Sequence, residues 1–270
     1  MNGAVAPQRR RPPWHRQPWF EALQFVLLLA LAGWLIARGA QSMGYEWKWH
    51  KVPRMLWRVV DGELVWGPLL RGLAVTLKLS SMAALLALAL GMATALLRLS
   101  GSIVGQALAW CYIELIRNTP ILVQILVMYF IVAASLGIPR DMAGVLCLGL
   151  YEGAFAAEII RGAIVAVRAG QWEAGRSLGF GPLHLYRDIV LPQAVPLMLP
   201  PLGGVLVNLV KHSAVVSVIA VFDLTNQARS LVSDTFMAFE IWLTTAALYL
   251  LVTVSLSLWV LWLEKRFRVP

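Results

Sequence analysis

The chain has 270 residues, of which 59% are hydrophobic and 14% are charged, and its formal net charge is +9. Soluble domains carry about 25% charged residues, so this composition leaves little room for a soluble domain. Several apolar runs reach the roughly 18 to 20 residues that a helix needs to cross a bilayer. The composition therefore predicts an all-α polytopic membrane protein. Positive charge on such a chain is typical of loops that face anionic membrane lipid, and it does not indicate nucleic acid as a partner.

The first part of the chain is basic and rich in proline, which disfavours a helix. Its arginines are Arg9, Arg10, Arg11 and Arg16. An apolar run follows at about 23–37, and basic residues before an apolar helix place the amino terminus in the cytoplasm. We therefore predict a cytoplasmic segment at 1–20 and an extra N-terminal transmembrane span at 21–40. A cleavable signal peptide is the alternative, because Ala37-Arg38-Gly39 has the small-x-small pattern of a cleavage site.

Residues 41–66 form a polar stretch rich in tryptophan, which we predict to be a periplasmic loop. Its indoles include Trp47, Trp49, Trp57 and Trp66. Indoles gather at membrane–water interfaces, which is the simplest explanation for them. The same stretch carries Lys48, Lys51, Arg54 and Arg58. Basic residues on a periplasmic loop conflict with the positive-inside rule.

Five further apolar segments follow, at about 68–97, 107–136, 142–166, 194–221 and 240–263. The first is too long for an upright span, so we expect it to tilt or to project beyond the membrane. Together with the first span they predict six spans with both termini inside. Gly149 and Gly153 form a small-xxx-small face that Ala157 extends, which favours close helix packing.

A polar segment between the fourth and fifth of these six spans has the pattern of a helical hairpin. Residues 172–178 are compatible with a helix, and Gly179 is placed to end it as a C′ glycine. Gly181-Pro182 puts proline where a second short helix begins. Leu191-Pro192 predicts a restricted backbone before the next span, because a residue before proline avoids the α region.

The same segment carries a spaced motif. Glu173-Ala174-Gly175 is followed after three residues by Gly179, and after nine more by Ile189-Val190-Leu191-Pro192. This spacing resembles the cytoplasmic coupling loop of ABC-importer permeases, with Gly175 standing where that family usually has alanine. Two further segments, Glu114-Leu-Ile-Arg117-Asn118-Thr119-Pro120 and Ala157-Glu158-Ile-Ile-Arg161-Gly162, look like motifs of the histidine/glutamine/glutamate-type polar amino-acid permeases.

The resemblance covers about 67–267 and implies the type I ABC-importer transmembrane fold, a five-span core to which this chain adds one N-terminal span. It implies a coupling loop at about 168–193, whose ATPase-coupling residues would be Glu173, Ala174, Gly175, Gly179, Leu191 and Pro192. The implied partners are an ABC ATPase subunit, a second permease subunit of the same or a similar chain, and a periplasmic amino-acid-binding protein. The implied location is the bacterial cell inner membrane.

The sequence predicts a non-catalytic subunit without a cofactor or metal of its own. It contains no Gly-Lys and so no phosphate-binding loop, which assigns ATP and Mg to a partner ATPase. Gly175-Arg176-Ser177-Leu178-Gly179 fits the G-x-S-x-G of serine hydrolases, but that motif needs a strand before the serine, where this sequence predicts a helix.

Ionisable residues within spans cost roughly 2.5–3.5 kcal/mol each on insertion scales, so they usually face a cavity or a partner. Our candidates for the substrate path are Glu158, Arg161, Lys211, His212, Arg117 and Asn118. Several structural roles stay open: Glu158 with Arg161 as an ion pair, Lys211 paired with Glu152 or Glu158, His212 as a packing residue, and Arg117 and Asn118 as braces of the break before Pro120. We also expect His212, which follows Lys211 where relatives often have an acidic or amide residue, to favour acidic or neutral polar substrates over basic ones.

An ATP-independent secondary amino-acid carrier is the alternative function, with Glu152, Glu158 and Lys211 as an ion relay. The absence of a strong internal repeat counts mildly against it, because many secondary carriers are built from two related halves.

Overall fold

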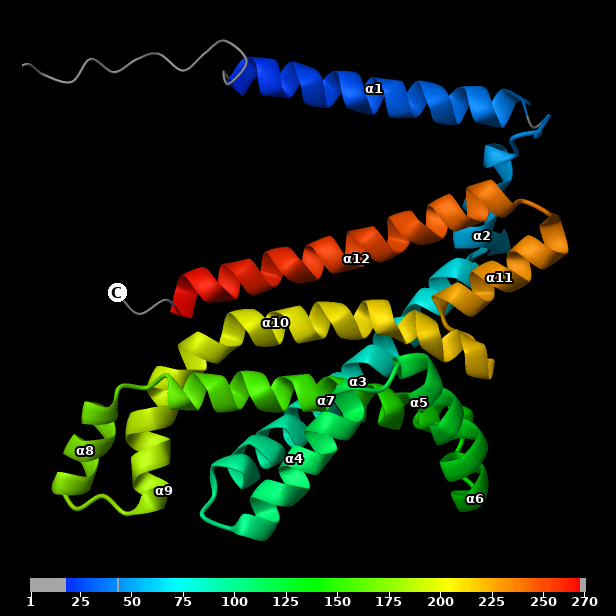
Figure 1. The fold of residues 1–270 in the computed structure, drawn as a ribbon. Coiled ribbons are helices and arrows are strands. Elements are labelled where there is room, and N and C mark those ends of the chain that lie inside the picture. The colour runs from blue at the N-terminus through cyan, green and yellow to red at the C-terminus, as the bar shows by residue number, and fades with distance from the viewer. Residues whose placement is uncertain (1–17, 43, 268–270) are drawn as a thin grey trace, which may run out of the picture. The chain divides into compact units, whose positions relative to one another are not determined.

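The computed structural model describes residues 18–42 and 44–267, which are almost entirely helical (Figure 1). The chain divides into two units after Trp47. The first unit contains α1 (Pro18–Ser42), whose stretch Trp19–Gly39 is long and apolar enough to cross a membrane. This agrees with the predicted extra span, whereas the predicted basic segment lies mostly outside the described residues.

The second unit begins with short elements in the tryptophan-rich stretch. They are η2 (Trp49–Lys51), α2 (Pro53–Leu56), β1 (Trp57–Val60) and β2 (Glu63–Trp66). The two strands pair antiparallel, with Trp57 opposite Trp66. Asp61 and Gly62 turn the hairpin with φ of 54° and 82°, the left-handed values of a type I′ turn, for which Asp-Gly is a preferred pair. We predicted only a loop here.

Four long helices form the body of the second unit: α3 (Pro68–Leu99), α7 (Arg140–Val165), α10 (Leu191–Val216) and α12 (Ala238–Phe267). Each is, or belongs to, a helix long and apolar enough to cross a membrane. The 32 residues of α3 rise about 48 Å, against a hydrocarbon core of about 30 Å. Figure 1 shows α3 running obliquely to α7 and α10, and its tilt relative to a membrane stays a prediction.

The predicted span at 107–136 is broken before Pro120, as the sequence indicated, but it is also sharply bent, which was not predicted. It consists of α4 (Ile103–Arg117), followed after a break by α5 (Ile121–Val127), η3 (Met128–Ala133) and α6 (Ala134–Leu136). The two parts are bent by 108°. Pro120 breaks the helix because its ring locks φ, its nitrogen has no hydrogen to donate, and it keeps the preceding residue out of the α region. The Gln124 side chain donates to the freed Ile116 and Thr119 carbonyls at 2.8 and 3.0 Å.

Small residues allow α3 and α7 to pack closely. A methyl group added at Gly149 would lie 2.6 Å from Cδ2 of Leu86 on α3, and one at Gly153 would lie 3.3 Å from Cβ of Leu90 on α3 and 2.9 Å from the Tyr112 hydroxyl on α4. At Gly91 it would meet the methyl of Ala156 at 2.7 Å. Since carbon atoms normally approach to about 3.5–4.0 Å, only glycine fits these positions. The predicted small-residue face of α7 is confirmed.

After α10, η5 (Ser217–Ile219) leads to α11 (Leu224–Thr235). Asp223 caps α11, and its carboxylate accepts from the backbone of Thr225 and Asn226 at 3.3 and 2.9 Å. Burial raises the pKa of Asp223 to about 6, against the lowering effect of those two bonds. Leu224, the first residue of α11, donates its N–H to the Thr76 hydroxyl of α3 at 3.1 Å, which ties the two helices together.

Candidate functional site

The polar hairpin between α7 and α10 begins with α8 (Ala169–Ser177). The helix ends as predicted: Leu178 is the C-cap, and Gly179 has a left-handed φ of 78°. The Gly179 N–H donates to the Arg176 carbonyl at 3.0 Å, and the Phe180 N–H donates to the Gly175 carbonyl at 3.1 Å. These bonds satisfy carbonyls that the helix end would otherwise leave open.

The second arm of the hairpin differs from the prediction. Here α9 (Pro182–His184) runs through the π-helical η4 (Leu185–Val190) directly into α10, giving one continuous helix from Pro182 to Ile219. Leu191 is α-helical, with φ −60° and ψ −42°, so the predicted restriction before Pro192 is wrong. Pro192 lies inside this continuous helix, in the turn that follows η4, and there it removes one N–H from the ladder. The wider turns of η4 lead into this turn without a break.

The two arms of the hairpin pack closely against each other. The Trp172 and Tyr186 rings meet edge to face, with centroids 5.2 Å apart. Gly175 is buried opposite η4, and a methyl group there would lie 2.4 Å from Cδ1 of Leu185 and 2.7 Å from Cδ1 of Ile189. The glycine that replaces the usual alanine of the motif therefore makes room for two side chains of the second arm.

The base of the hairpin is part of the core of the spans. Leu185 and Val190 are buried in one cluster with Ile160 and Ile164 of α7 and with Met198 of α10. Because this apolar contact joins the second arm to both spans, the hairpin and the ends of α7 and α10 form one packed unit.

The far side of the hairpin is exposed. Glu173 and Ala174 face outward on α8, and the Glu173 carboxylate has no ion pair within the described part of the chain. The Ser177 hydroxyl donates to the Glu173 carbonyl at 3.0 Å within the helix. Since α8 and not a strand precedes Ser177, the geometry of a hydrolase nucleophile is missing here.

A cavity of about 240 Å³ lies between the two spans that the hairpin joins. From α7 it is lined by Tyr151, Glu152, Phe155 and Ile159, and from α10 by Pro201, Gly204, Val205, Asn208 and His212. Gly204 has open space where a side chain would begin, whereas at the neighbouring Gly203 a methyl group would lie 2.1 Å from Cγ1 of Val260. One glycine therefore keeps the cavity open, and the next lets α10 and α12 approach.

A carboxylate–imidazole pair joins the two walls of the cavity. Oε1 of Glu152 lies 2.7 Å from Nδ1 of His212, and the ring also meets Tyr151 edge to face at 5.5 Å. The Glu152 side chain is 2% exposed and that of His212 is 35% exposed. A buried carboxylate needs such a partner. With a proton on Nδ1, the ring donates to Glu152 and leaves Nε2 as a second polar group of the His212 side chain.

The other candidate residues for the substrate path lie outside this lining. Arg161 donates to Glu158 through Nη2 at 2.9 Å and through Nε at 3.2 Å, so they form an ion pair within α7. Lys211 is exposed and makes no ion pair with described residues, since Glu152 and Glu158 are paired with His212 and Arg161.

The last two candidates, Arg117 and Asn118, lie at the break between α4 and α5. The guanidinium of Arg117 lies over the Phe155 ring, 5.4 Å from its centroid, and so reaches a residue of the cavity wall. Asn118 caps α4 and donates to the Glu114 carbonyl and carboxylate, both at 2.8 Å. This is the bracing geometry that the sequence left open for Asn118.

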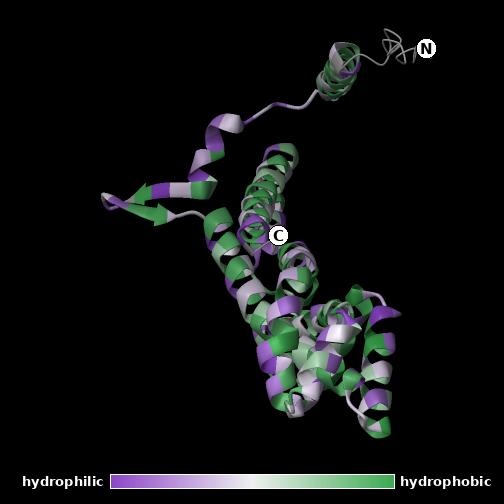
Figure 2. Ribbon diagram, turned by 90° about the vertical axis from the view of Figure 1, so that its left-hand side faces the viewer, coloured by the Kyte–Doolittle hydropathy of each residue, from purple (hydrophilic) through white to green (hydrophobic). Residues whose placement is uncertain are grey.

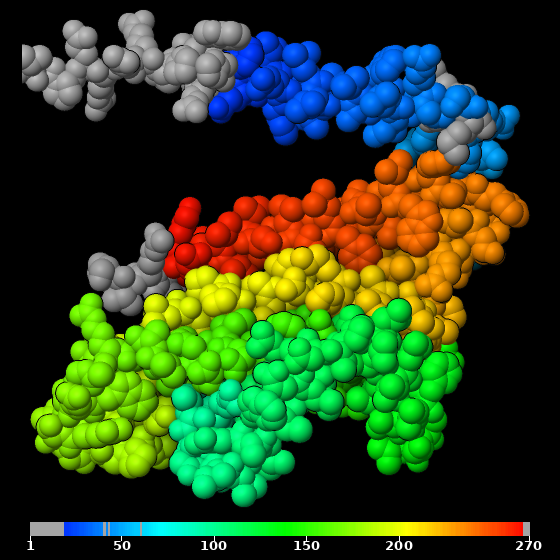
Figure 3. All heavy atoms as spheres, viewed as in Figure 1, coloured from blue at the N-terminus to red at the C-terminus, as the bar shows by residue number. Residues whose placement is uncertain are grey.

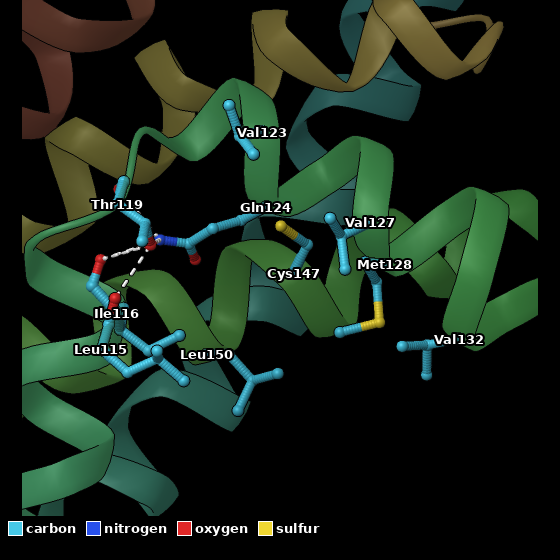
Figure 4. A pocket seen from close by; sticks show the side chains of 10 residues that line it. All are labelled: Leu115, Ile116, Thr119, Val123, Gln124, Val127, Met128, Val132, Cys147 and Leu150. Carbon is cyan, nitrogen blue, oxygen red and sulfur yellow. Dashed lines mark hydrogen bonds between the residues drawn. The ribbon is translucent and has the colours of Figure 1, made fainter.

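A second hollow lies inside the bend between α4 and η3, where Figure 3 shows two arms of the chain standing apart. It measures about 330 Å³, and its walls are almost entirely apolar. Figure 4 shows its lining, in which the Gln124 amide points toward Thr119 and is already hydrogen-bonded there at 2.6 Å. The hollow therefore offers little to an amino acid, whose ammonium and carboxylate need polar partners.

Sequence reasoning missed Tyr151, Phe155, Gly204 and Asn208 as cavity residues. Asn208 is a polar side chain inside an apolar span, and that signal was available. No described part of the chain groups three or more His, Cys, Asp or Glu residues in a way that could hold a metal ion.

A multi-pass helical protein with a polar cavity between two spans, and an exposed hairpin joining those spans, has the architecture of a membrane transport protein. The chain matches the model of the family described as "Binding-protein-dependent transport system inner membrane component" over residues 66–269. It belongs to that family, and it is a membrane-spanning permease subunit of an ABC importer.

The chain is similar to named relatives along most of its length. It is 41% identical over 180 residues to the probable glutamine ABC transporter permease protein GlnM of Bacillus subtilis, covering 66% of this chain and 83% of the relative. It is 34% identical over 215 residues to the glutamine transport system permease protein GlnP of Escherichia coli, covering 77% and 98%.

Solved structures agree. A crystal structure of an amino acid ABC transporter with histidines is 39% identical, with a TM-score of 0.68, and covers 74% of this chain and 94% of that one. The inward-facing MetNI methionine ABC transporter is 18% identical, with a TM-score of 0.64 over 74% and 96%, and shares the fold. The predicted type I importer fold is confirmed, and these findings favour an ABC permease over the secondary carrier.

Proposed function

We propose that this permease subunit carries polar amino acids of the size and polarity of glutamine across the bacterial inner membrane, through the cavity between α7 and α10. One observation supports this most strongly. The two helices that line the cavity are the two helices that the hairpin at 166–190 joins. A displacement of the hairpin is therefore delivered to both walls of the cavity at once.

In this proposal the exposed side of the hairpin docks on a separate ATPase subunit, with Glu173 and Ala174 at the contact. The packed base at Leu185 and Val190 then transmits the movement to the spans. ATP and Mg²⁺ act only in the partner. The permease changes state because its two conformations contact the ATPase differently, which is what any ligand-driven shift requires.

The same proposal includes a second permease subunit, of this or a similar chain, and a solute-binding protein on the periplasmic side. It rests on the family, whose description names binding-protein-dependent transport, and on the relatives, which are subunits of such systems. Lipid would surround α1 and the outer faces of the spans, whose large apolar side chains are exposed.

The cavity wall suggests which amino acids it accepts. Glu152 is held by His212, so its carboxylate is not free to neutralise a cationic side chain. Asn208 and His212 line the cavity with hydrogen-bonding side chains, and the Asn208 amide can pair with a side-chain amide of the substrate. We therefore propose that neutral and acidic polar amino acids are carried in preference to arginine and lysine.

Transport by the reconstituted complex tests this proposal. The permease, its ATPase and its binding protein would be placed in proteoliposomes, and uptake of labelled glutamine measured with ATP inside and without it. The proposal predicts that uptake requires ATP. Excess unlabelled glutamine should abolish the uptake of labelled glutamine, whereas excess arginine should not. Uptake that follows an ion gradient at constant ATP, or a strong preference for arginine, would contradict it.

A further inference from the structure

The hairpin of β1 and β2 has one apolar face. The register pairs Trp57 with Trp66 and Val59 with Leu64. Since alternate residues of a strand point to the same side, these four side chains share one face, and Arg58 and Glu63 lie on the other together with the half-buried Val65. The four apolar side chains are 50–69% exposed, so no described residue of the chain covers this face.

The hairpin leaves the body of the second unit at the level where the apolar part of the spans begins. Val52 and Met55, just before β1, are buried in one cluster with Leu69 of α3, with Met237 just before α12 and with Ile241 in its first turn. The apolar run of α12 starts at Ile241, directly after an acidic residue. The base of the hairpin therefore lies near the boundary between water and the hydrocarbon region.

The hairpin also extends sideways from this boundary. Figure 2 views α12 nearly end-on and shows the two strands projecting laterally from the start of α3, largely green, with a hydrophilic tip. A hairpin directed across the spans in this way runs roughly parallel to a membrane surface.

Basic side chains surround the same elements. Lys51, Arg54 and Arg58 are exposed, and none of them forms an ion pair with a described residue. Lysine and arginine near a membrane surface attract the phosphate groups of lipids, at about 1 kcal/mol each where the lipids are anionic. They are three of the four basic residues that conflict with the positive-inside rule.

We propose that the hairpin lies flat on the outer leaflet of the membrane, with its apolar face in the lipid interface, Lys51 and Arg54 at lipid phosphates, and Arg58 on the face turned to water. Two interfacial indoles with adjacent basic residues are the composition of such an anchor. A protein partner fits less well, because a face of four side chains is far smaller than the roughly 20 to 30 residues per side of a specific protein interface. Under this proposal Lys51 and Arg54 of the periplasmic loop are explained by contact with lipid phosphates, and the topology need not be reversed to satisfy the positive-inside rule.

Spin labels on the two faces test this proposal in the full-length chain. Single cysteines would replace Val59 and Leu64 on the apolar face and, as matched controls, Arg58 and Glu63 on the other. Cys111 and Cys147 would be changed to alanine in this background. Nitroxide labels would be examined in nanodiscs of phosphatidylethanolamine and phosphatidylglycerol, by their accessibility to oxygen, which concentrates in lipid, and to a nickel chelate, which stays in water.

The proposal predicts a several-fold higher ratio of oxygen to nickel accessibility at positions 59 and 64 than at positions 58 and 63. Equal, water-like ratios at all four positions would show the hairpin standing in solvent and would overturn it. Immobile labels at 59 and 64 that neither reagent reaches would show a protein contact, such as a second copy of the chain, and would overturn it equally. None of these results depends on transport activity.

Discussion

Two neighbouring glycines of α10 provide a sharp test of the cavity, because they face different surroundings. At Gly204 an added methyl group meets nothing within 4 Å, whereas at Gly203 it would lie 2.1 Å from Cγ1 of Val260 on α12. A normal carbon contact is about 3.5–4.0 Å, so Gly203→Ala requires a shift of about 1.5 Å. Overpacking of this kind costs about 1–3 kcal/mol.

The gain in helix propensity, up to about 1 kcal/mol for glycine to alanine, is common to both substitutions and cancels in the comparison. We therefore expect Gly203→Ala to be less stable than Gly204→Ala by about 1–3 kcal/mol. Unfolding in mixed detergent, followed by tryptophan fluorescence, measures this difference. Equal stabilities would refute the assignment of the two faces.

A larger side chain at Gly204 tests function separately from folding. Gly204→Leu would place its side chain in the cavity of about 240 Å³. We expect a folded, assembled protein whose ATP-driven uptake falls at least about tenfold, equivalent to about 1.4 kcal/mol. Uptake at the unmodified rate would mean that substrate passes elsewhere.

Three further predictions concern single side chains. Gly179→Ala should cost about 1–2 kcal/mol, because its φ is 78°, whereas Gly181→Ala, at φ −70°, should be nearly neutral in the same denaturation assay. His212→Ala should cost about 3–5 kcal/mol by leaving the buried Glu152 carboxylate unpaired, and adding Glu152→Gln should restore most of that stability. Because the pKa of Asp223 is raised to about 6, the folded state binds its proton more tightly, so stability should fall by up to about 3 kcal/mol as pH rises from about 4 to about 6. Asp223→Asn should remove that part of the pH dependence, and an unchanged profile in this variant would contradict the assignment.

The spans could be predicted from the sequence because hydropathy and length decide them almost alone. The turn at Gly179 followed from a local rule, since few residues other than glycine adopt a left-handed backbone at a helix end. A local rule failed at Pro192. It predicts that Leu191, the residue before proline, avoids the α region, but Leu191 is α-helical because a continuous helix enters α10 through π-helical turns. At Pro120 the break was expected, but the bend of 108° was not, because it depends on how α5 packs against other helices.

The cavity could be predicted only in part. His212 was a candidate because an ionisable group inside a span needs a partner. Its partner, Glu152, lies 60 residues away on α7, and only the packing of α7 against α10 brings the two within 2.7 Å. Lys211 was an equal candidate in the sequence, but it lies on a different face of α10. The hairpin at Asp61-Gly62 was readable from its turn residues and was overlooked among the tryptophans.

The central claim is that the hairpin couples this permease to a separate ATPase. Affinity purification of the tagged chain from native membranes in mild detergent, with bound proteins identified by mass spectrometry, tests it most directly. Glu173→Ala would be compared with Ser177→Ala, an exposed neighbour on the same helix. We predict that a phosphate-binding-loop ATPase is recovered with the unmodified chain and with Ser177→Ala, and is lost or much reduced with Glu173→Ala. Recovery of no ATPase from intact, folded protein, or equal recovery with all three, would contradict the account.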